Sequence, residues 1–259
     1  MSADVPTDNF YVAAYEPGAE QPALPSWASR QANPAELDSH YSGNVRRVAV
    51  ERLPATFQLL EVLASDECQR LIDLSESLGY LPDAAVSLPR SVRHNDNVVW
   101  VVDEDTDDII WKRIAHLLED LPSLFDGKSP LGINARFRFY RYGPDDYFNA
   151  HTDGAWPGSR VINNELITNA YPDRFSQMSF LIFLNDDFEG GATRFLVTGA
   201  DQKRPAQHGD PVIKVDVRTP VGGVLCFPHG SHPLHCVHSS EPIETGTKYI
   251  IRTDLLFEL

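Results

Sequence analysis

From about residue 131 onward the sequence is a succession of short β-type segments, and this pattern restricts the possible folds most strongly. Within 133–142, Phe137 and Phe139 alternate with Arg136 and Arg138, which is the two-residue period of a half-buried strand. Further runs of strand-like composition are 178–184, 193–197, 212–217, 223–227 and 248–257. Glycines at 190–191, 222–223 and 246 mark turns between them. The pattern predicts a mainly β protein with flanking α, either a jelly roll or a barrel.

Two helices are expected before this β-rich half. Ser65, followed by Asp66 and Glu67, has the composition of a helix start, and apolar residues recur at helical spacing as far as Leu78. A second helical pattern begins near Thr106 and is stopped by Pro122. Neither segment carries an evident reactive group, so both are expected to pack against one sheet of the β core.

The chain is expected to form one folded domain preceded by an arm. Residues 1–50 are rich in Pro, Ala, Glu and Ser, which predicts an extended or partly disordered segment, wrapped on the surface or held by its aromatics over a site entrance. The remaining 51–259 divide into a helical part, 51–130, and a β core, 131–259. A single β domain of this size is ordinary.

The charge balance excludes some partners. With 22 basic and 37 acidic residues the net charge is −15, so the surface repels nucleic acid backbones and anionic lipid, and a basic or neutral substrate is better tolerated. The three cysteines form no CxxC pair, which argues against a thiolate zinc site and for a reducing compartment. Without a signal-like N-terminus or an apolar run of about 18 residues, a cytoplasmic protein is expected. The oligomeric state stays open.

A candidate metal site begins at His151-Thr152-Asp153. Residues two apart on a strand face the same side, so this histidine and this carboxylate can converge on one cation. Four histidines in the C-terminal half are available as a third ligand: His229, His232, His235 and His238. Two histidines and one carboxylate, with three coordination positions left open, are typical of non-haem Fe(II) oxygenases. A single HxD pattern is common by chance, so the surrounding residues have to support this interpretation.

Those residues do support it, because the chain from about 136 to 257 resembles a known family. The blocks that carry the likeness are 141–153 (RYGPDDYFNAHTD), 179–195 with its SFLIFLND and EGGATRF stretches, and 238–248 (HSSEPIETGTK). In this order they are similar to the prolyl-4-hydroxylase-like branch of the 2-oxoglutarate- and Fe(II)-dependent dioxygenases. The resemblance implies a double-stranded β-helix (jelly roll) core, with the N-terminal helices packed on one sheet.

The resemblance also implies roles for individual residues. His151, Asp153 and His238 match the family's iron ligands; His238 is favoured because Pro, an aliphatic residue, Gly and Lys follow it at the family's spacing, with His235 in reserve. Lys248 matches the cation that binds the distal carboxylate of 2-oxoglutarate, and Arg252, on the same strand face, is the alternative. Further candidates for hydroxyl contacts to that carboxylate are Tyr142 and Ser179. The competing interpretations are that Lys248 is an exposed lysine on a strand and that Tyr142 is an aromatic residue of the core.

The activity implied is a hydroxylase with Fe(II), 2-oxoglutarate and O₂ as cofactors and ascorbate as a candidate stimulant, acting on an unactivated C–H bond of a small molecule, amino acid or peptide. The carboxylate of Asp153 favours hydroxylation over halogenation. The family's tryptophan after the lysine strand is absent, and 153–176 is a long insertion, so a prolyl substrate is not carried over. Two alternatives remain: a cupin-like metal enzyme that does not use 2-oxoglutarate, and a non-catalytic jelly-roll sensor or binding protein.

Overall fold

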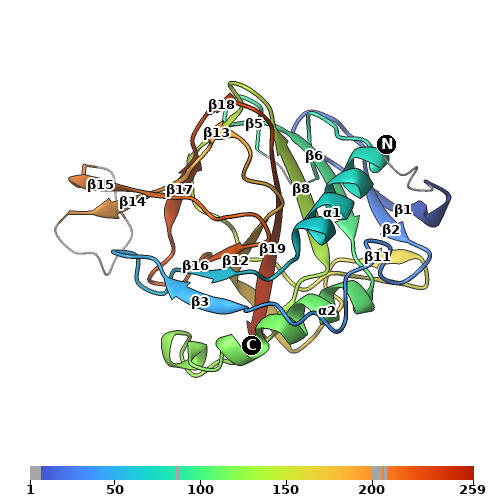
Figure 1. Cartoon of the computed structure of the whole chain (residues 1–259), viewed down its shortest axis with the longest axis horizontal. Helices are drawn as coiled ribbons and strands as arrows, with labels where there is room; N and C mark the ends of the chain where they lie inside the picture. Colours follow the sequence, from blue (N-terminus) through green and yellow to red (C-terminus); the bar gives the residue numbers. More distant parts are fainter. Residues whose placement is uncertain (1–6, 86–87, 200–205, 207–208) are drawn as a thin grey trace.

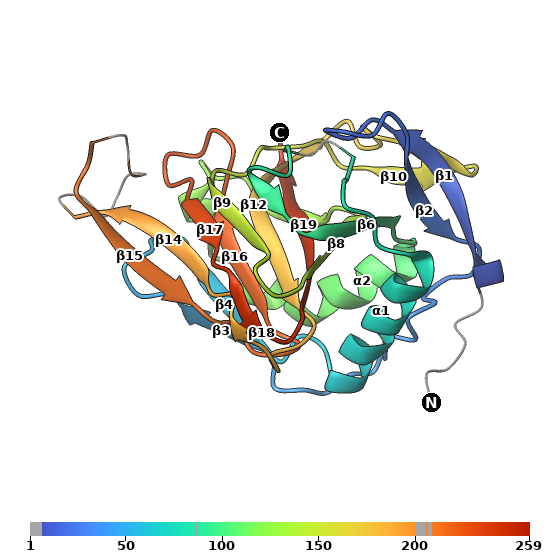
Figure 2. The same cartoon turned by 90° about the horizontal axis from the view of Figure 1, so that it is seen from above.

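Two β-sheets that pack face to face make up most of the molecule, and two helices cover the outer face of the larger sheet (Figures 1 and 2). The structure is a computed structural model, and it describes residues 7–85, 88–199, 206 and 209–259. The helices are η1 (Thr7–Asn9), α1 (Ser65–Leu78), α2 (Glu104–Ile114), η2 (Ala115–Leu117) and η3 (Leu121–Leu124). The strands are β1 (Phe10–Glu16), β2 (Leu24–Ser29), β3 (Arg46–Ala49), β4 (Phe57–Leu60), β5 (Arg93–His94), β6 (Asp96–Val101), β7 (Pro130–Ile133), β8 (Arg136–Tyr142), β9 (Tyr147–His151), β10 (Arg160–Ile162), β11 (Glu165–Ile167), β12 (Arg174–Phe183), β13 (Glu189–Gly190), β14 (Thr193–Thr198), β15 (Val212–Val217), β16 (Val224–Pro228), β17 (Val237–Ser240), β18 (Ile243–Thr245) and β19 (Lys248–Glu258).

The larger sheet has ten strands in the order β1-β2-β6-β8-β19-β12-β16-β4-β3, with β7 also paired to β19. The smaller sheet has five, in the order β15-β14-β17-β9-β5. All pairs are antiparallel except β2 with β6. Neighbours in space are mostly distant in sequence, as in a jelly roll, and the prediction of a mainly β jelly-roll core with flanking helices is confirmed.

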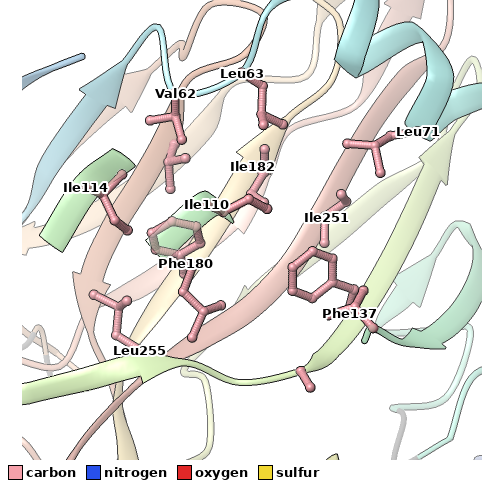
Figure 3. Close-up of a cluster of buried hydrophobic side chains, with 14 of the residues drawn as sticks. Val62, Leu63, Leu71, Ile110, Ile114, Phe137, Phe180, Ile182, Ile251 and Leu255 are labelled. Atoms are coloured by element: carbon pink, nitrogen blue, oxygen red, sulfur yellow. The ribbon is translucent and has the colours of Figure 1, made fainter. Parts of the chain in front are cut away.

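Alternation along β8 separates two hydrophobic cores. Phe137 and Phe139 point to the helix side, where they pack with Leu71 of α1 and Ile110 of α2. Figure 3 shows this core, which continues through residues of β12 and β19. Each fully buried leucine or isoleucine of this kind contributes roughly 1.5–3 kcal/mol, so both helices are held chiefly by burial of their apolar faces.

The opposite face of the same strands forms the core between the two sheets. Tyr140 and Tyr142 of β8 lie there together with Leu181 and Ile250 of the larger sheet and Phe195 of β14 in the smaller sheet. Because side chains alternate across a strand, the arginines of β8 that are in phase with these tyrosines share the inter-sheet face. This face also carries the polar residues of the candidate site.

The expected N-terminal arm is part of the main sheet instead. Within it, β1 and β2 form an antiparallel pair, and Ser26 and Trp27 pair in parallel with Val99 and Trp100 of β6. Phe10 is buried against Trp100 with ring centroids 5.7 Å apart. The strand tolerates proline because Pro25 of β2 lies outside the two residues, Ser26 and Trp27, that pair with β6. Residues 1–6 lie outside the described part.

Both predicted helices form, with shifted ends. The residue before α1 is Ala64, so Ser65 is its first helical residue rather than its cap, and the Glu67 carboxylate accepts from the Ala64 amide at 2.9 Å. The second helix starts at Glu104, capped by Asp103, and ends at Ile114 before two 3₁₀ turns, the latter of which contains Pro122. None of the helices described is long and apolar enough to cross a membrane.

Candidate metal centre

Two histidines meet directly across a pair of strands in the smaller sheet. His238 on β17 pairs with His151, the last residue of β9, and their ring centroids lie 4.3 Å apart. Side chains of directly opposed residues in an antiparallel pair share one face. Sequence positions almost ninety residues apart therefore present two imidazoles to the same point.

Asp153 joins them from the loop that follows β9. One of its carboxylate oxygens, Oδ1, lies 3.6 Å from His151 Nε2, and the other, Oδ2, lies 3.8 Å from His238 Nε2. The ligand atoms of the three residues all lie within 4.8 Å of one another, and in the described part of the chain this is the one such group of His, Cys, Asp or Glu. The structure thus brings together the three predicted metal ligands.

The second nitrogen of each imidazole is turned toward a backbone carbonyl. His151 Nδ1 lies 2.8 Å from the carbonyl oxygen of Asn149, and His238 Nδ1 lies 3.2 Å from that of Cys236. A carbonyl oxygen accepts a hydrogen bond, so Nδ1 donates in both residues, and the lone pair of each Nε2 is left directed toward Asp153. Two neutral imidazoles and a carboxylate fit a divalent metal such as Fe(II).

Electrostatics keep these groups in the form that binds a metal. Burial alone would raise the pKa of Asp153, but Arg252, His238 and His151 hold it well below its usual range. Burial, reinforced by His151, lowers the pKa of His238 to about 4. At neutral pH the site therefore offers an ionised carboxylate and an uncharged His238.

The other C-terminal histidines have different positions. His235 Nδ1 bonds its own turn, at the His232 carbonyl, and His232 Nε2 lies 2.8 Å from the carbonyl oxygen of Leu124. His229 is buried behind Asp153, with Ser179 Oγ within hydrogen-bonding distance of both residues. None of the three belongs to the metal-ligand group.

A narrow cavity lies beside the three ligands and runs along the inter-sheet face of β8 and β19. Its walls include His151, Asp153, His238, Lys248, Arg252, Tyr140, Tyr142, Phe148, Leu181, Thr193, Ser239, Ser240 and Ile250. On β19 the residues Lys248, Ile250 and Arg252 point into it in succession. Lys248 and Arg252 are thus four strand residues apart, roughly 13 Å between their Cα atoms.

Lys248 marks the end of the cavity remote from Arg252. It is 1% exposed, and its Nζ donates to the Gly191 carbonyl at 2.7 Å and to Ser240 Oγ at 3.1 Å. Burial, reinforced by Arg218, lowers the pKa of Lys248 to about 7. No carboxylate of the described chain forms an ion pair with it, so an anionic ligand would supply the missing counter-charge. The exposed-lysine interpretation is wrong.

The backbone at Gly191 lies directly against the Lys248 side chain and accepts its hydrogen bond. Gly190 and Gly191 both have positive φ, 75° and 61°, which glycine adopts without strain. A Cβ on Gly191 would lie 2.4 Å from Ile243 Cδ1 and 3.4 Å from Lys248 Cδ. The paired glycines of the EGGAT stretch thus allow the backbone to approach Lys248 closely enough to accept its hydrogen bond.

The remaining predicted site residues divide into two groups. Tyr142 pairs with Lys248 across β8 and β19, its ring centroid 5.3 Å from Nζ, and it lines the cavity as well as the core. Arg252 lies at the opposite end, its Nε 3.5 Å from Asp153 Oδ2. Ser179 is a correction: its hydroxyl donates to Asp153 Oδ2 at 2.6 Å, next to the metal ligands and away from Lys248.

Among the cavity residues that were not predicted, three have evident contacts with predicted ones. Phe148 stacks on the imidazole of His151 at 3.6 Å between centroids and fixes the plane of that ring. Ser240 and Thr193, which pair across β17 and β14, place hydroxyls near Lys248. Ser240 could have been found from its position two residues after His238 on one strand face, and Thr193 from its place in the EGGAT stretch.

Comparisons with known proteins add a distant structural likeness. No protein-family model matches the chain, and no curated protein matches it. Among solved structures, the viral collagen prolyl hydroxylase of Paramecium Bursaria Chlorella virus-1 is 16% identical, covers 79% of this chain and 97% of its own, and has a TM-score of 0.49. A Pseudomonas putida prolyl-4-hydroxylase is also 16% identical, with 78% and 91% coverage and a TM-score of 0.49. A Trichoplax adhaerens prolyl hydroxylase, solved with a hypoxia inducible factor peptide fragment, is 14% identical, with 78% and 83% coverage and a TM-score of 0.49. At these values, the likeness does not assign an activity.

Proposed function

We propose that this protein is a non-haem Fe(II) oxygenase that couples oxidative decarboxylation of 2-oxoglutarate to hydroxylation of an unactivated C–H bond in a small molecule, amino acid or peptide. The observation that carries the proposal is the pairing of two features in one cavity. A His–Asp–His group lies at one end, and at the other lies a buried lysine that pairs with no carboxylate of the described residues. A dicarboxylic 2-oxo acid requires both a metal chelation site and a remote cation.

The protein residues would hold the two cofactors as follows. His151, Asp153 and His238 would hold Fe(II), and Lys248 would bind the distal carboxylate of 2-oxoglutarate. Bound together with O₂, iron and 2-oxoglutarate supply the oxidising chemistry that removes a substrate hydrogen. The sequence resemblance and the donor set support this assignment independently.

The surrounding residues would orient the ligands and exclude water. Phe148 holds the His151 ring in plane, and the carbonyls of Asn149 and Cys236 fix both histidine tautomers. The side chains of Leu181 and Ile250 make the cavity wall between the two ends apolar. An apolar wall that excludes water strengthens the interaction of Lys248 with a bound carboxylate, because water does not compete for the charge.

The deciding experiment is an anaerobic Fe(II) titration with and without 2-oxoglutarate, monitored by the weak visible charge-transfer absorption of the chelate. We expect the absorption in the parent and in His235→Ala, and none in His238→Ala. His235 is the matched control, because it lies three residues away and its Nδ1 bonds its own turn. If iron binds and no absorption develops on adding 2-oxoglutarate, the assignment is incorrect, and a cupin-like enzyme or a sensor becomes the better interpretation.

Replacement of the carboxylate ligand tests the reaction type. Asp153→Ala should abolish hydroxylation, because two histidines alone leave the metal without its anionic ligand. The measurement is succinate release together with hydroxylated product, once a substrate is identified. Retention of more than a trace of hydroxylated product would contradict the role of Asp153 as a metal ligand.

A further inference from the structure

Arg138 is a buried guanidinium without a carboxylate or hydrogen-bonding partner in the described part of the chain. Its side chain is 7% exposed, it forms no ion pair and no hydrogen bond, and its Nε is fully enclosed. Burial, reinforced by the neighbouring Arg252, lowers its pKa to about 10. An enclosed cation with no anion is costly, so its retention calls for a ligand.

A nearby arginine shows how this fold neutralises a structural guanidinium. Arg136 lies two residues earlier on the same face of β8, and its two terminal nitrogens donate to Glu16 at 2.8 and 3.0 Å. That pair is bidentate and complete, as a buried structural arginine requires. Arg138, at comparable depth, has no such carboxylate among the residues that the structure describes.

Arg138 borders the proposed active site. On β8 it directly continues the row formed by Tyr142 and Tyr140, which line the cavity, and its partner across the strand pair is Arg252. Directly opposed side chains lie close together on one face. The Arg138 guanidinium therefore lies level with Arg252, at the metal end of the cavity and away from Lys248.

Trp156 covers the guanidinium from the loop that begins at the metal ligand. The charge centre of Arg138 lies 5.6 Å from the centroid of the Trp156 ring. Trp156 follows Asp153 by three residues, and its amide is fixed by Ser176 Oγ at 2.7 Å. A guanidinium over an aromatic ring can keep its N–H groups free, and these groups bind a carboxylate by two parallel hydrogen bonds.

The charge balance around the cavity points to an anion. Three cations, Arg138, Arg252 and Lys248, stand against two carboxylates, Asp153 and Asp254, of which the latter lies 3.1 Å from Arg252. A divalent metal and a dianionic 2-oxoglutarate cancel each other, so the surplus of one positive charge persists in the loaded site. One carboxylate on the substrate would neutralise it.

We propose that Arg138, with its charge centre over the ring of Trp156 and level with Arg252, binds a carboxylate of the substrate, which makes the substrate class a carboxylic acid such as an amino acid or a peptide with a free C-terminus. This assignment rests on the proposed function and narrows it. It departs from the expectation, based on the acidic surface, of a basic or neutral substrate, because the lining of the cavity has the opposite charge from the exterior.

The test compares a carboxylate with its neutral isostere. The protein is loaded anaerobically with Fe(II) and 2-oxoglutarate and titrated calorimetrically with propionate and with propionamide. We expect saturable binding of propionate and none of propionamide, and a propionate affinity weakened roughly tenfold or more in Arg138→Gln. Arg138→Lys keeps the positive charge and loses the paired N–H donors of the guanidinium, so its propionate affinity should lie between those of the parent and Arg138→Gln. Arg30→Gln, which removes an exposed arginine, is the matched control and should bind as the parent does.

A second readout separates binding from a structural role. Without propionate, the thermal midpoint of Arg138→Gln should equal or exceed that of the parent, because an unpaired buried charge is removed. Arg136→Gln, which leaves Glu16 unpaired, should lower the midpoint. A lower midpoint in Arg138→Gln, equal binding of propionate and propionamide, absence of propionate binding, or unchanged propionate affinity in Arg138→Gln would each overturn the assignment.

The two proposals fail in different ways. If 2-oxoglutarate does not bind the Fe(II)-loaded parent at all, the proposed function fails, and the substrate assignment falls with it. If 2-oxoglutarate binds and propionate shows no dependence on Arg138, the oxygenase assignment stands and only the carboxylate subsite is wrong.

Discussion

Lys248 is a buried cation whose hydrogen bonds go to two neutral oxygens, a carbonyl and a hydroxyl. Few charged groups influence Lys248. Arg218 lowers its pKa by charge repulsion, and Tyr142 contributes the face of its ring, which carries no charge. The empty protein therefore holds this lysine near the midpoint of its titration at neutral pH, and an arriving dianion would favour its protonated form.

The affinity for 2-oxoglutarate should therefore fall as the pH rises above about 7, which is the pKa of Lys248. The affinity falls rather than rises because the bound dianion raises the pKa of Lys248. Binding above pH 7 therefore takes up a proton, and the affinity declines by up to about tenfold per pH unit. Calorimetry at pH 8 in two buffers of different ionisation enthalpy measures the uptake directly. Lys248→Arg, which stays protonated, should show none; equal uptake in both proteins would contradict the role of Lys248.

At this scale the sequence identified the metal ligands more reliably than their supporting residues. His151, Asp153 and His238 were singled out by the resemblance of three sequence blocks to a known family, and the structure brings them together. Ser179 was assigned to the wrong end of the cavity because a hydroxyl on a strand gives no indication of which neighbour it will meet. Arg138 was recognised only as part of an alternating strand, since the absence of a partner is a property of the folded state.

Among the elements, several strands of the β core were predictable to within one residue at each end. The run 212–217 coincides with β15, and 248–257 falls one residue short of the end of β19. Strong alternation and glycine turns explain this success. The polar segment 93–97, in which no strand pattern is evident, contributes to strands β5 and β6. Its polar side chains are buried by β8 and β9, which only the tertiary structure brings together.

The two helices are joined by an enclosed ion pair that neither pattern revealed. Arg113 of α2 donates to both carboxylate oxygens of Glu67 of α1, at 2.7 and 2.8 Å, and Glu67 also accepts from the amides of Ala64 and Asp38. Burial would raise the pKa of Glu67, but Arg113 and these amides lower it below its usual value. The pair links α1, α2 and the chain before β3.

Glu67→Gln should lower the free energy of unfolding by about 3 kcal/mol, because it leaves the Arg113 guanidinium buried without its counter-charge. In the parent, this contribution is present above the unfolded-state pKa of the carboxyl and is lost as the pH falls through the lowered folded-state value. Urea denaturation at pH 7 and at pH 4 measures both effects. The control Asp66→Asn removes an exposed carboxylate that pairs with Arg70. This control should leave the urea midpoint unchanged. An equal loss of unfolding free energy in Glu67→Gln and Asp66→Asn would refute the interpretation.

Considered as a whole molecule, the proposed metal site connects the two sheets. His151 and His238 belong to the smaller sheet, while Asp153 contacts Arg252 on the central strand of the larger one. Several segments distant in sequence are therefore held by one small group of atoms. A metal bound there would stabilise the folded state alone, since the unfolded chain has no such arrangement.

Addition of Fe(II) without oxygen at about 100 times its dissociation constant should stabilise the protein by about 2.7 kcal/mol. For a chain of this size that corresponds to a rise of roughly 5–10 °C in the thermal midpoint, reversed by a chelator. Scanning calorimetry measures the shift, which Asp153→Ala should abolish. Asp173→Ala, which removes a carboxylate paired with adjacent Arg174 on the surface, should keep it in full. A metal-induced rise that survives in Asp153→Ala would place the metal elsewhere.

The position of β19 in the larger sheet has a consequence for synthesis. This strand follows every strand with which it pairs, and it alone joins β8 to β12. Before it leaves the ribosome, the nascent chain can assemble only two separate half-sheets, β1-β2-β6-β8 and β12-β16-β4-β3, each with an open edge. The same late segment carries Lys248 and Arg252. Until β19 emerges, the chain therefore exposes unpaired strand edges and lacks two residues of the proposed site, so chaperones that shield strand edges should matter most at that stage of translation.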